Sequence, residues 1–134
     1  MLKRLIPLCV AVSFSSFAIS SETCLYAGFN EKLNSVKCDI STPQGVEPDG
    51  INPLFLKMIK FDGKLRYFYI EQHSENDSSA NIGFLSDDAF SLAKSGSSFF
   101  WIDKNKNIVN NLSNSSYECL QNNKSKEMLC ISSW

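Results

Sequence analysis

Two apolar, aromatic-rich runs flank Asp62-Gly63 in the segment LFLKMIKFDGKLRYFYIEQ, and this is the clearest pattern in the chain. An Asp-Gly pair between two such runs is typical of a two-residue hairpin turn, because both turn positions must accept positive φ. Pairing outward from the turn places Met58 opposite Tyr67 on a largely apolar face. The other face carries Ile59 and Arg66. We therefore expect a hairpin that is buried on both faces at its base and exposed at its tip on the face of Ile59 and Arg66.

A short helix over Leu54–Phe61 is the alternative for the first of these runs. Asn52 suits the helix N-cap, Pro53 the first helical position and Gly63 the residue beyond the end. The hairpin accounts better for the Asp-Gly pair. We favour the hairpin and keep the helix as the alternative.

Two further hairpins and one helix follow from the remaining patterns. The segment SSFFWIDKNKNIVNNLS contains an aromatic run, a polar turn and a second apolar run, and the chain from Tyr117 onward has another polar turn between apolar runs. The segment SDDAFSLAKSG, residues 86–96, predicts a short helix. Ser86 is its N-cap, acidic residues occupy its first turn and Gly96 lies beyond its end.

The fold class expected from these elements is mainly β. The segments Ser41–Asn52 and His73–Asn81 are rich in turn-forming residues and are expected to be exposed loops. No internal repeat or linker divides the chain. We expect a single small antiparallel β-sheet or barrel-like domain of about seven strands, arranged as a hairpin meander with one short helix.

The first 20 residues, MLKRLIPLCVAVSFSSFAIS, have the layout of a secretory signal peptide: basic residues, an apolar run and then small residues. Ala18 and Ser20 are the small residues that a signal peptidase reads, which predicts cleavage after Ser20. The apolar run is shorter than the roughly 20 residues that span a bilayer, so no stable membrane insertion is expected after cleavage. We therefore divide the chain into a signal peptide, residues 1–20, and a β-rich domain, residues 21–134, in the periplasm or secreted.

The charge balance argues against a nucleic-acid partner. The whole chain has 13 basic and 14 acidic residues, and the predicted signal peptide contains two of the basic and none of the acidic ones. The remaining 114 residues therefore carry 11 basic and 14 acidic residues, a net charge of −3. Nucleic-acid binding depends on clustered Lys and Arg that neutralise phosphates. No such cluster follows Arg4.

The cysteines predict a disulfide framework. Four remain after the signal peptide, and an even number in a short exported chain favours disulfides, although four cysteines allow three pairings. A hairpin loop centred between Lys124 and Ser125 places Cys119 directly opposite Cys130, within reach of a disulfide. Cys24 and Cys38 bracket a segment that can fold back on itself. We therefore favour the pairs Cys24–Cys38 and Cys119–Cys130. The spacings fit neither a zinc site nor a Cys-x-x-Cys redox pair.

Other candidates for chemistry are weak. His73 lies in QHSEND beside serine and acidic residues, the residue types of a hydrolase triad, but no Gly-x-Ser-x-Gly motif accompanies it. DKNKN resembles the start of a calcium loop, yet Ile108 and Asn114 stand where that loop needs glycine and glutamate. We therefore expect no catalytic residue, no metal and no cofactor.

Three consecutive aromatic residues, Phe99, Phe100 and Trp101, cannot all face one side of a strand. We expect them chiefly to fill the core, as in buried strands that read as continuous apolar runs. The alternative is an exposed anchor for a protein partner, since Trp and Tyr are enriched in interface hot spots. The candidate partner-binding residues are Trp101, Phe100, His73 and Tyr67.

One short motif resembles a known family. Ser95-Gly96 precedes Phe100-Trp101-Ile102-Asp103-Lys104, and small periplasmic inhibitors of c-type lysozyme carry Ser-Gly followed later by Phe-Trp-x-Lys-Gly. The likeness covers about ten residues. The spacing between the two parts is shorter here, and the lysine is displaced by one position with no glycine after it. The resemblance implies a disulfide-bearing β-barrel that inhibits an enzyme.

The expected function is that of a small exported, non-catalytic protein that binds a protein partner, as inhibitor and immunity proteins do. The basis is a mildly acidic, disulfide-stapled domain without a defensible nucleophile, acid–base pair or metal set. The alternatives are a barrel like the lysozyme inhibitors, a small hydrolase that uses His73, and a structural component of an envelope assembly.

Overall fold

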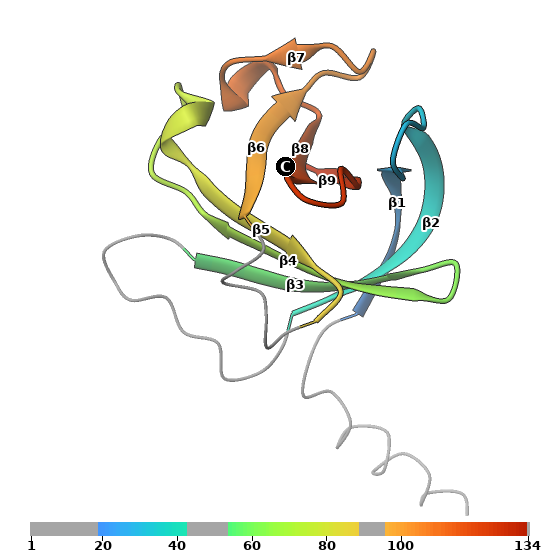
Figure 1. Ribbon diagram of the computed structural model, residues 1–134. Coiled ribbons are helices and arrows are strands. Elements are labelled where there is room, and N and C mark those ends of the chain that lie inside the picture. The colour runs from blue at the N-terminus through green and yellow to red at the C-terminus, as the bar shows by residue number, and fades with distance from the viewer. Residues whose placement is uncertain (1–18, 43–53, 89–95, 134) are drawn as a thin grey trace, which may run out of the picture.

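The computed structural model describes residues 19–42, 54–88 and 96–133, which form one antiparallel sheet of nine strands (Figure 1). The strands are β1 (Ile19–Ala27), β2 (Asn34–Ser41), β3 (Leu54–Phe61), β4 (Lys64–Glu71), β5 (Ile82–Ser86), β6 (Gly96–Ile102), β7 (Ile108–Val109), β8 (Tyr117–Asn122) and β9 (Met128–Ser132). Two single 3-10 turns, η2 (Ser78–Ala80) and η4 (Leu112–Asn114), interrupt the connections.

The sheet closes into a barrel. Its strand order is β5-β4-β3-β2-β1-β9-β8-β6-β7, and β5 also pairs with β6, so eight strands form a closed ring. The short strand β7 pairs only with the end of β6 and lies outside the ring. The expected β-rich, barrel-like class is confirmed. The expected count of about seven strands is slightly low, and the five-residue strand β5 was not among the predicted elements.

The helix expected over residues 86–96 is not tested as a whole, since residues 89–95 lie outside the described part of the chain. Its expected N-cap, Ser86, is the last residue of β5, and its hydroxyl accepts a hydrogen bond from the backbone N–H of Asp88 at 3.1 Å. In the three described ranges the only helical elements are the two 3-10 turns. No helix in those ranges is long and apolar enough to cross a membrane.

The hairpin at Asp62-Gly63 has the predicted register. Strands β3 and β4 pair Met58 with Tyr67 and Lys60 with Leu65. Both turn residues have positive φ, 48° at Asp62 and 74° at Gly63. The alternative of a helix over Leu54–Phe61 is therefore wrong.

The expected exposure of the hairpin's second face is also wrong. Ile59 and Phe68, which lie on that face, are almost fully buried inside the barrel, whereas Tyr67 on the other face is half-exposed on the outside. The neighbouring strands decide this, because Ile40 pairs with Ile59 and Leu85 pairs with Phe68. Those buried neighbours curve the sheet toward the face that looked less apolar in the hairpin alone.

Side chains fill the barrel interior. Trp101, Phe68 and Leu120 are among the largest fully buried residues and belong to one continuous apolar cluster. Gly83 of β5 faces inward against Leu120, and a Cβ at this position would overlap the Leu120 side chain. The glycine therefore permits the close approach of β5 to the core.

Both predicted disulfides are present. Cys119 and Cys130 are direct register partners with Cα atoms 4.1 Å apart, whereas Cys24 and Cys38 are offset along β1 and β2 with Cα atoms 6.0 Å apart. The first pair belongs to a smaller apolar cluster with Leu25 outside the ring, and the second belongs to the interior cluster. Two disulfides in a chain of this size fit an oxidising compartment.

Replacing both Cys119 and Cys130 by alanine is expected to lower the free energy of unfolding by about 3 kcal/mol under oxidising conditions. The cause is the release of a constraint in the unfolded chain, where the disulfide joins two positions with a sequence separation of 11. Denaturant unfolding of both proteins, with and without reductant, measures the effect. The difference should shrink in reductant, and unfolding curves that overlay under oxidising conditions would contradict the expectation.

Candidate functional site

One end of the barrel holds a hollow of about 640 Å³, which we call the mouth. It is lined by residues from the end of β1 and the loop after it, from β4, from the end of β5 and from the β8–β9 hairpin. These segments are far apart in sequence and meet only because the ring closes. Barrel mouths are common locations for binding sites.

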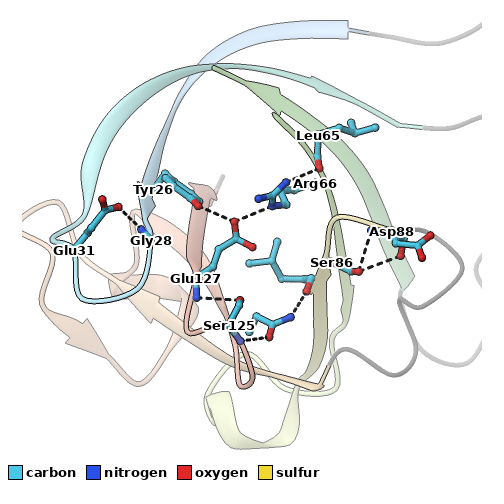
Figure 2. A network of polar contacts seen from close by, with 11 residues as sticks. Tyr26, Gly28, Glu31, Leu65, Arg66, Ser86, Asp88, Ser125 and Glu127 are labelled. Carbon is cyan, nitrogen blue, oxygen red and sulfur yellow. Dashed lines mark hydrogen bonds and ion pairs between the residues drawn. The ribbon is translucent and has the colours of Figure 1, made fainter. Parts of the chain in front are cut away.

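A three-residue polar network lies at the mouth (Figure 2). One carboxylate oxygen of Glu127, Oε1, accepts hydrogen bonds from the Tyr26 hydroxyl and from Arg66 Nε, each at 2.8 Å. Arg66 also donates from Nη1 to the carbonyl oxygen of Leu65 at 3.0 Å. The side chains of Arg66 and Glu127 are only 16% and 12% exposed. This ion pair is therefore shielded more than a surface pair, and its geometry is set before any ligand arrives.

The pKa of Tyr26 is raised at this site. Burial and the hydrogen bond to the Glu127 carboxylate together raise the pKa of Tyr26 to about 12, with burial the larger cause. Tyr26 also packs against Phe61, with ring centroids 4.7 Å apart, and Lys64 Nζ lies 4.8 Å from its ring centre. A tyrosine held in this way serves as a hydrogen-bond donor and not as a base.

The hairpin between β8 and β9 forms one wall of the mouth. Asn122 Oδ1 accepts hydrogen bonds from the backbone N–H groups of Lys124 and Ser125, both at 2.9 Å. Asn122 Nδ2 donates to the carbonyl oxygen of Leu85 at 2.7 Å and so ties this hairpin to β5. Hydrogen bonds within the hairpin and one hydrogen bond to β5 therefore hold this wall in place.

Beside this hairpin, the turn after β1 forms another part of the rim of the mouth, since Ala27 pairs with Met128. The backbone N–H of Gly28 donates to Glu31 Oε1 at 2.7 Å, which holds the turn closed (Figure 2). Next to it, Phe29 lines the mouth while 66% of the residue remains exposed. Phe29 is thus an exposed aromatic side chain that lines the same hollow as the hydrogen-bonded network of Tyr26, Arg66 and Glu127.

The charges around the mouth balance. Arg66 and Lys124 contribute positive charge, and Asp87 and Glu127 contribute negative charge. The described lining thus combines charged and amide side chains with the apolar ring of Phe29.

A second exposed region lies on the outer faces of β3, β4 and β5. Met58, Tyr67, Tyr69 and Phe84 are half-exposed there, and the rings of Tyr69 and Phe84 are 5.7 Å apart. Tyr67, one of the residues proposed from the sequence, belongs to this face.

The structure does not bring the four candidate partner-binding residues together. Trp101 is fully buried inside the barrel and reaches no surface. Phe100 points the other way and is half-buried against the outer cluster around Cys119. Tyr67 lies on the outer face described above, and His73 follows β4 in the loop toward η2. Strand alternation separates Trp101 from Phe100, so the two cannot form one anchor.

The ring of His73 pairs with a carboxylate, and the hydroxyl of the neighbouring Ser74 is engaged by backbone groups. Its Nε2 lies 2.9 Å from Glu71 Oε1, while the Ser74 hydroxyl accepts hydrogen bonds from the backbone N–H groups of Asn76 and Asp77. Within the residues that the structure describes, no three His, Cys, Asp or Glu side chains gather as metal ligands.

The residues at the mouth were missed from the sequence. Tyr26 and Glu127 are separated by 101 positions, and no local pattern links them. Arg66 gave no distinct signal either, because Lys57 and Lys64 lie on the same face of the predicted hairpin. Comparison with protein-family models, with curated proteins and with solved structures finds no match for this chain.

Proposed function

We propose that this chain is an exported, non-catalytic protein that binds a protein partner through the mouth of its barrel, in the manner of an inhibitor or immunity protein. The observation that carries the proposal is the exposed ring of Phe29 beside the pre-ordered network of Tyr26, Arg66 and Glu127. The predicted signal peptide and the two disulfides support a periplasmic or secreted location.

A protein partner suits this arrangement better than a small molecule enclosed in the barrel. The interior is occupied by large side chains such as Trp101 and Phe68, so binding groups are available at the mouth and on the outside. Interfaces combine an aromatic anchor with a polar surround, which is the combination at Phe29. Because hydrogen bonds within the protein already hold Arg66 and Asn122, little side-chain freedom is lost when a partner docks.

Phe29→Ala is expected to weaken partner binding by about 2 kcal/mol, or about 30-fold in Kd, and to leave the unfolding curve unchanged. The reason is that Phe29 contributes exposed surface and little core contact. The oxidised, processed protein serves as bait for native envelope proteins, and the affinity of the recovered partner is then measured.

Ile108→Ala is the matched control. Ile108 is 74% exposed, does not line the mouth and lies on β7, so its loss should leave the affinity unchanged. His73→Ala should also retain binding, whereas loss of function in that variant would favour the hydrolase alternative. If the Phe29 variant and the wild type bind the partner with equal affinity, the mouth is not the binding surface.

A further inference from the structure

The ion pair between Arg66 and Glu127 leaves two hydrogen-bonding atoms unused at the mouth. Both hydrogen bonds to the Glu127 carboxylate end on Oε1, and within the described part of the chain its Oε2 accepts none (Figure 2). Arg66 donates from Nε and Nη1, and no described residue accepts a hydrogen bond from its Nη2. Trp101 Nε1 is the one fully enclosed polar side-chain atom of the described residues that has no partner. Oε2 and Nη2 are therefore open to solvent, and both residues line the mouth.

The charged groups of the mouth differ in exposure. Lys124 and Asp87 are exposed on its rim, where solvent screens a charge and reduces its contribution to binding. The side chains of Arg66 and Glu127 are mostly buried. Because a shielded site strengthens polar interactions, this pair is expected to decide which chemical group the mouth accepts.

The pair offers a hydrogen-bond donor and an acceptor without a net charge. A carboxylate that accepts from Arg66 Nη2 also approaches the carboxylate of Glu127. A cation that donates to Glu127 Oε2 also approaches the Arg66 guanidinium group. Each of these ligands brings an uncompensated charge into a partly buried site, which costs free energy. A neutral group that has both an acceptor and a donor avoids this cost.

A primary carboxamide is the neutral side-chain group that fits. The side chain of Asn or Gln carries a carbonyl oxygen that accepts and an NH₂ group that donates, so each atom can contact one member of the pair. A single trans peptide group fits less well, because its C=O and N–H bonds point in opposite directions. A hydroxyl group carries both functions on one oxygen and cannot contact the two members separately.

We propose that the protein partner inserts an Asn or Gln side chain into the mouth, where its carbonyl oxygen accepts from Arg66 Nη2 and its NH₂ group donates to Glu127 Oε2. This partner chemistry rests on the proposed function and adds to it. Phe29 lines the same hollow and supplies apolar contact area beside the amide. Hydrogen bonds from Tyr26 and Arg66 already hold the Glu127 carboxylate, which reduces the conformational freedom lost on binding.

Selection of cyclic peptides from a random displayed library, with the oxidised, exported protein as target, tests the chemistry. One peptide position is expected to be enriched in Asn or Gln. In a synthetic peptide from this pool, replacing that amide residue by its carboxylate counterpart or by leucine should weaken binding to the wild type by about ten-fold or more. Enrichment in acidic, basic or hydroxyl residues at the contact position, or no enrichment at all, would overturn the amide proposal.

Glu127→Gln tests which atoms recognise the amide. The carbonyl oxygen of the new side chain can still accept from Tyr26 and Arg66, while its NH₂ group replaces Oε2. The acceptor at the site becomes a donor and the site gains one positive charge. The variant is therefore expected to bind the carboxylate peptide about ten-fold more tightly than the amide peptide, which reverses the order of the wild type.

Glu75→Gln is the matched control for this variant. Glu75 is exposed and does not line the mouth, so its replacement should retain the preference for the amide peptide. An unchanged amide preference in Glu127→Gln would overturn the proposal. Unfolding curves verify that the variants fold, and the comparison of peptides on the wild type does not depend on them.

Phe29→Ala distinguishes a failure of this proposal from a failure of the proposed function. If the selected peptides lack an amide but lose affinity for Phe29→Ala, the mouth binds a partner of different chemistry and only the amide proposal is wrong. If every selected peptide binds Phe29→Ala as tightly as the wild type, the mouth is not the binding surface and both proposals are wrong.

Discussion

Trp101→Ala should lower the free energy of unfolding by about 3 to 5 kcal/mol, the usual range for deleting a fully buried large aromatic side chain. Trp101 is fully buried, and its ring meets Phe99 edge-to-face with centroids 5.1 Å apart. The truncation leaves a cavity inside a ring of strands that can collapse only partly. Denaturant unfolding of the oxidised protein measures the loss. An unfolding curve that overlays that of the wild type would mean that Trp101 is not a core residue.

The Trp101→Phe variant distinguishes the effect of lost side-chain volume from the effect of the buried indole N–H group. Among the described residues, Trp101 Nε1 is a buried donor without a hydrogen-bond acceptor, and such a group costs about 1 to 3 kcal/mol. The phenylalanine variant loses some volume but also removes this donor. It should therefore be clearly more stable than the alanine variant. A matched control is Phe29→Ala, which deletes an exposed aromatic ring and should leave stability unchanged.

Glu118→Gln is expected to stabilise the protein by about 3 kcal/mol above pH 7 and to have a much smaller effect near pH 4.5. Glu118 is 8% exposed and lies in register between Trp101 and Ile131, both of which face the interior. Desolvation raises the pKa of its carboxyl from 4.5 to about 7, and the opposing attraction of Lys57 is smaller.

The direction in which stability changes with pH follows from proton binding. The folded pKa of Glu118 lies above the unfolded one, so the folded chain holds the proton more tightly. The wild type should therefore lose stability as pH rises from 4.5 to 7, and the glutamine variant should lack that loss because it cannot ionise. Denaturation midpoints measured across this range test the difference.

Comparing the wild type with Glu118→Gln isolates the effect of Glu118 on stability from the effects of the other carboxyl groups. Hydrogen bonds from Ser79 lower the pKa of Asp77, which acts in the opposite direction and cancels in the comparison. Glu75→Gln, at an exposed position, should leave the pH profile as it is in the wild type. A stability difference between wild type and Glu118→Gln that does not change between pH 4.5 and 7 would refute the assignment.

Local patterns were sufficient for several features of this fold. The register at Asp62-Gly63 and the Cys119–Cys130 pair were predictable, because a two-strand hairpin is determined by its turn residues and by the period of two along each strand. The pair Cys24–Cys38 also follows from short separation along the chain. The class of the fold follows from the number of such hairpins.

Other features required all the strands together. The ring closes through β5 with β6 and through β1 with β9, and neither pairing joins strands of a predicted hairpin. This closure decides that Ile59 faces inward and Tyr67 outward, although the hairpin alone favoured the reverse exposure at its tip. A hairpin alone has two faces, and one of them becomes the interior of a barrel only when the neighbouring strands curve the sheet.

By itself the sequence determined the β-rich class and the hairpin turns, and it favoured the two disulfide pairs among the three possible pairings, since these features depend on residues close together in the chain. Only the tertiary structure decided that Trp101 faces the interior while Phe100 faces outward, and that Tyr26, Arg66 and Glu127 meet at one mouth. The physical reason is that burial and the convergence of distant side chains depend on the curvature of the closed sheet. That curvature results from contacts among strands far apart in the chain.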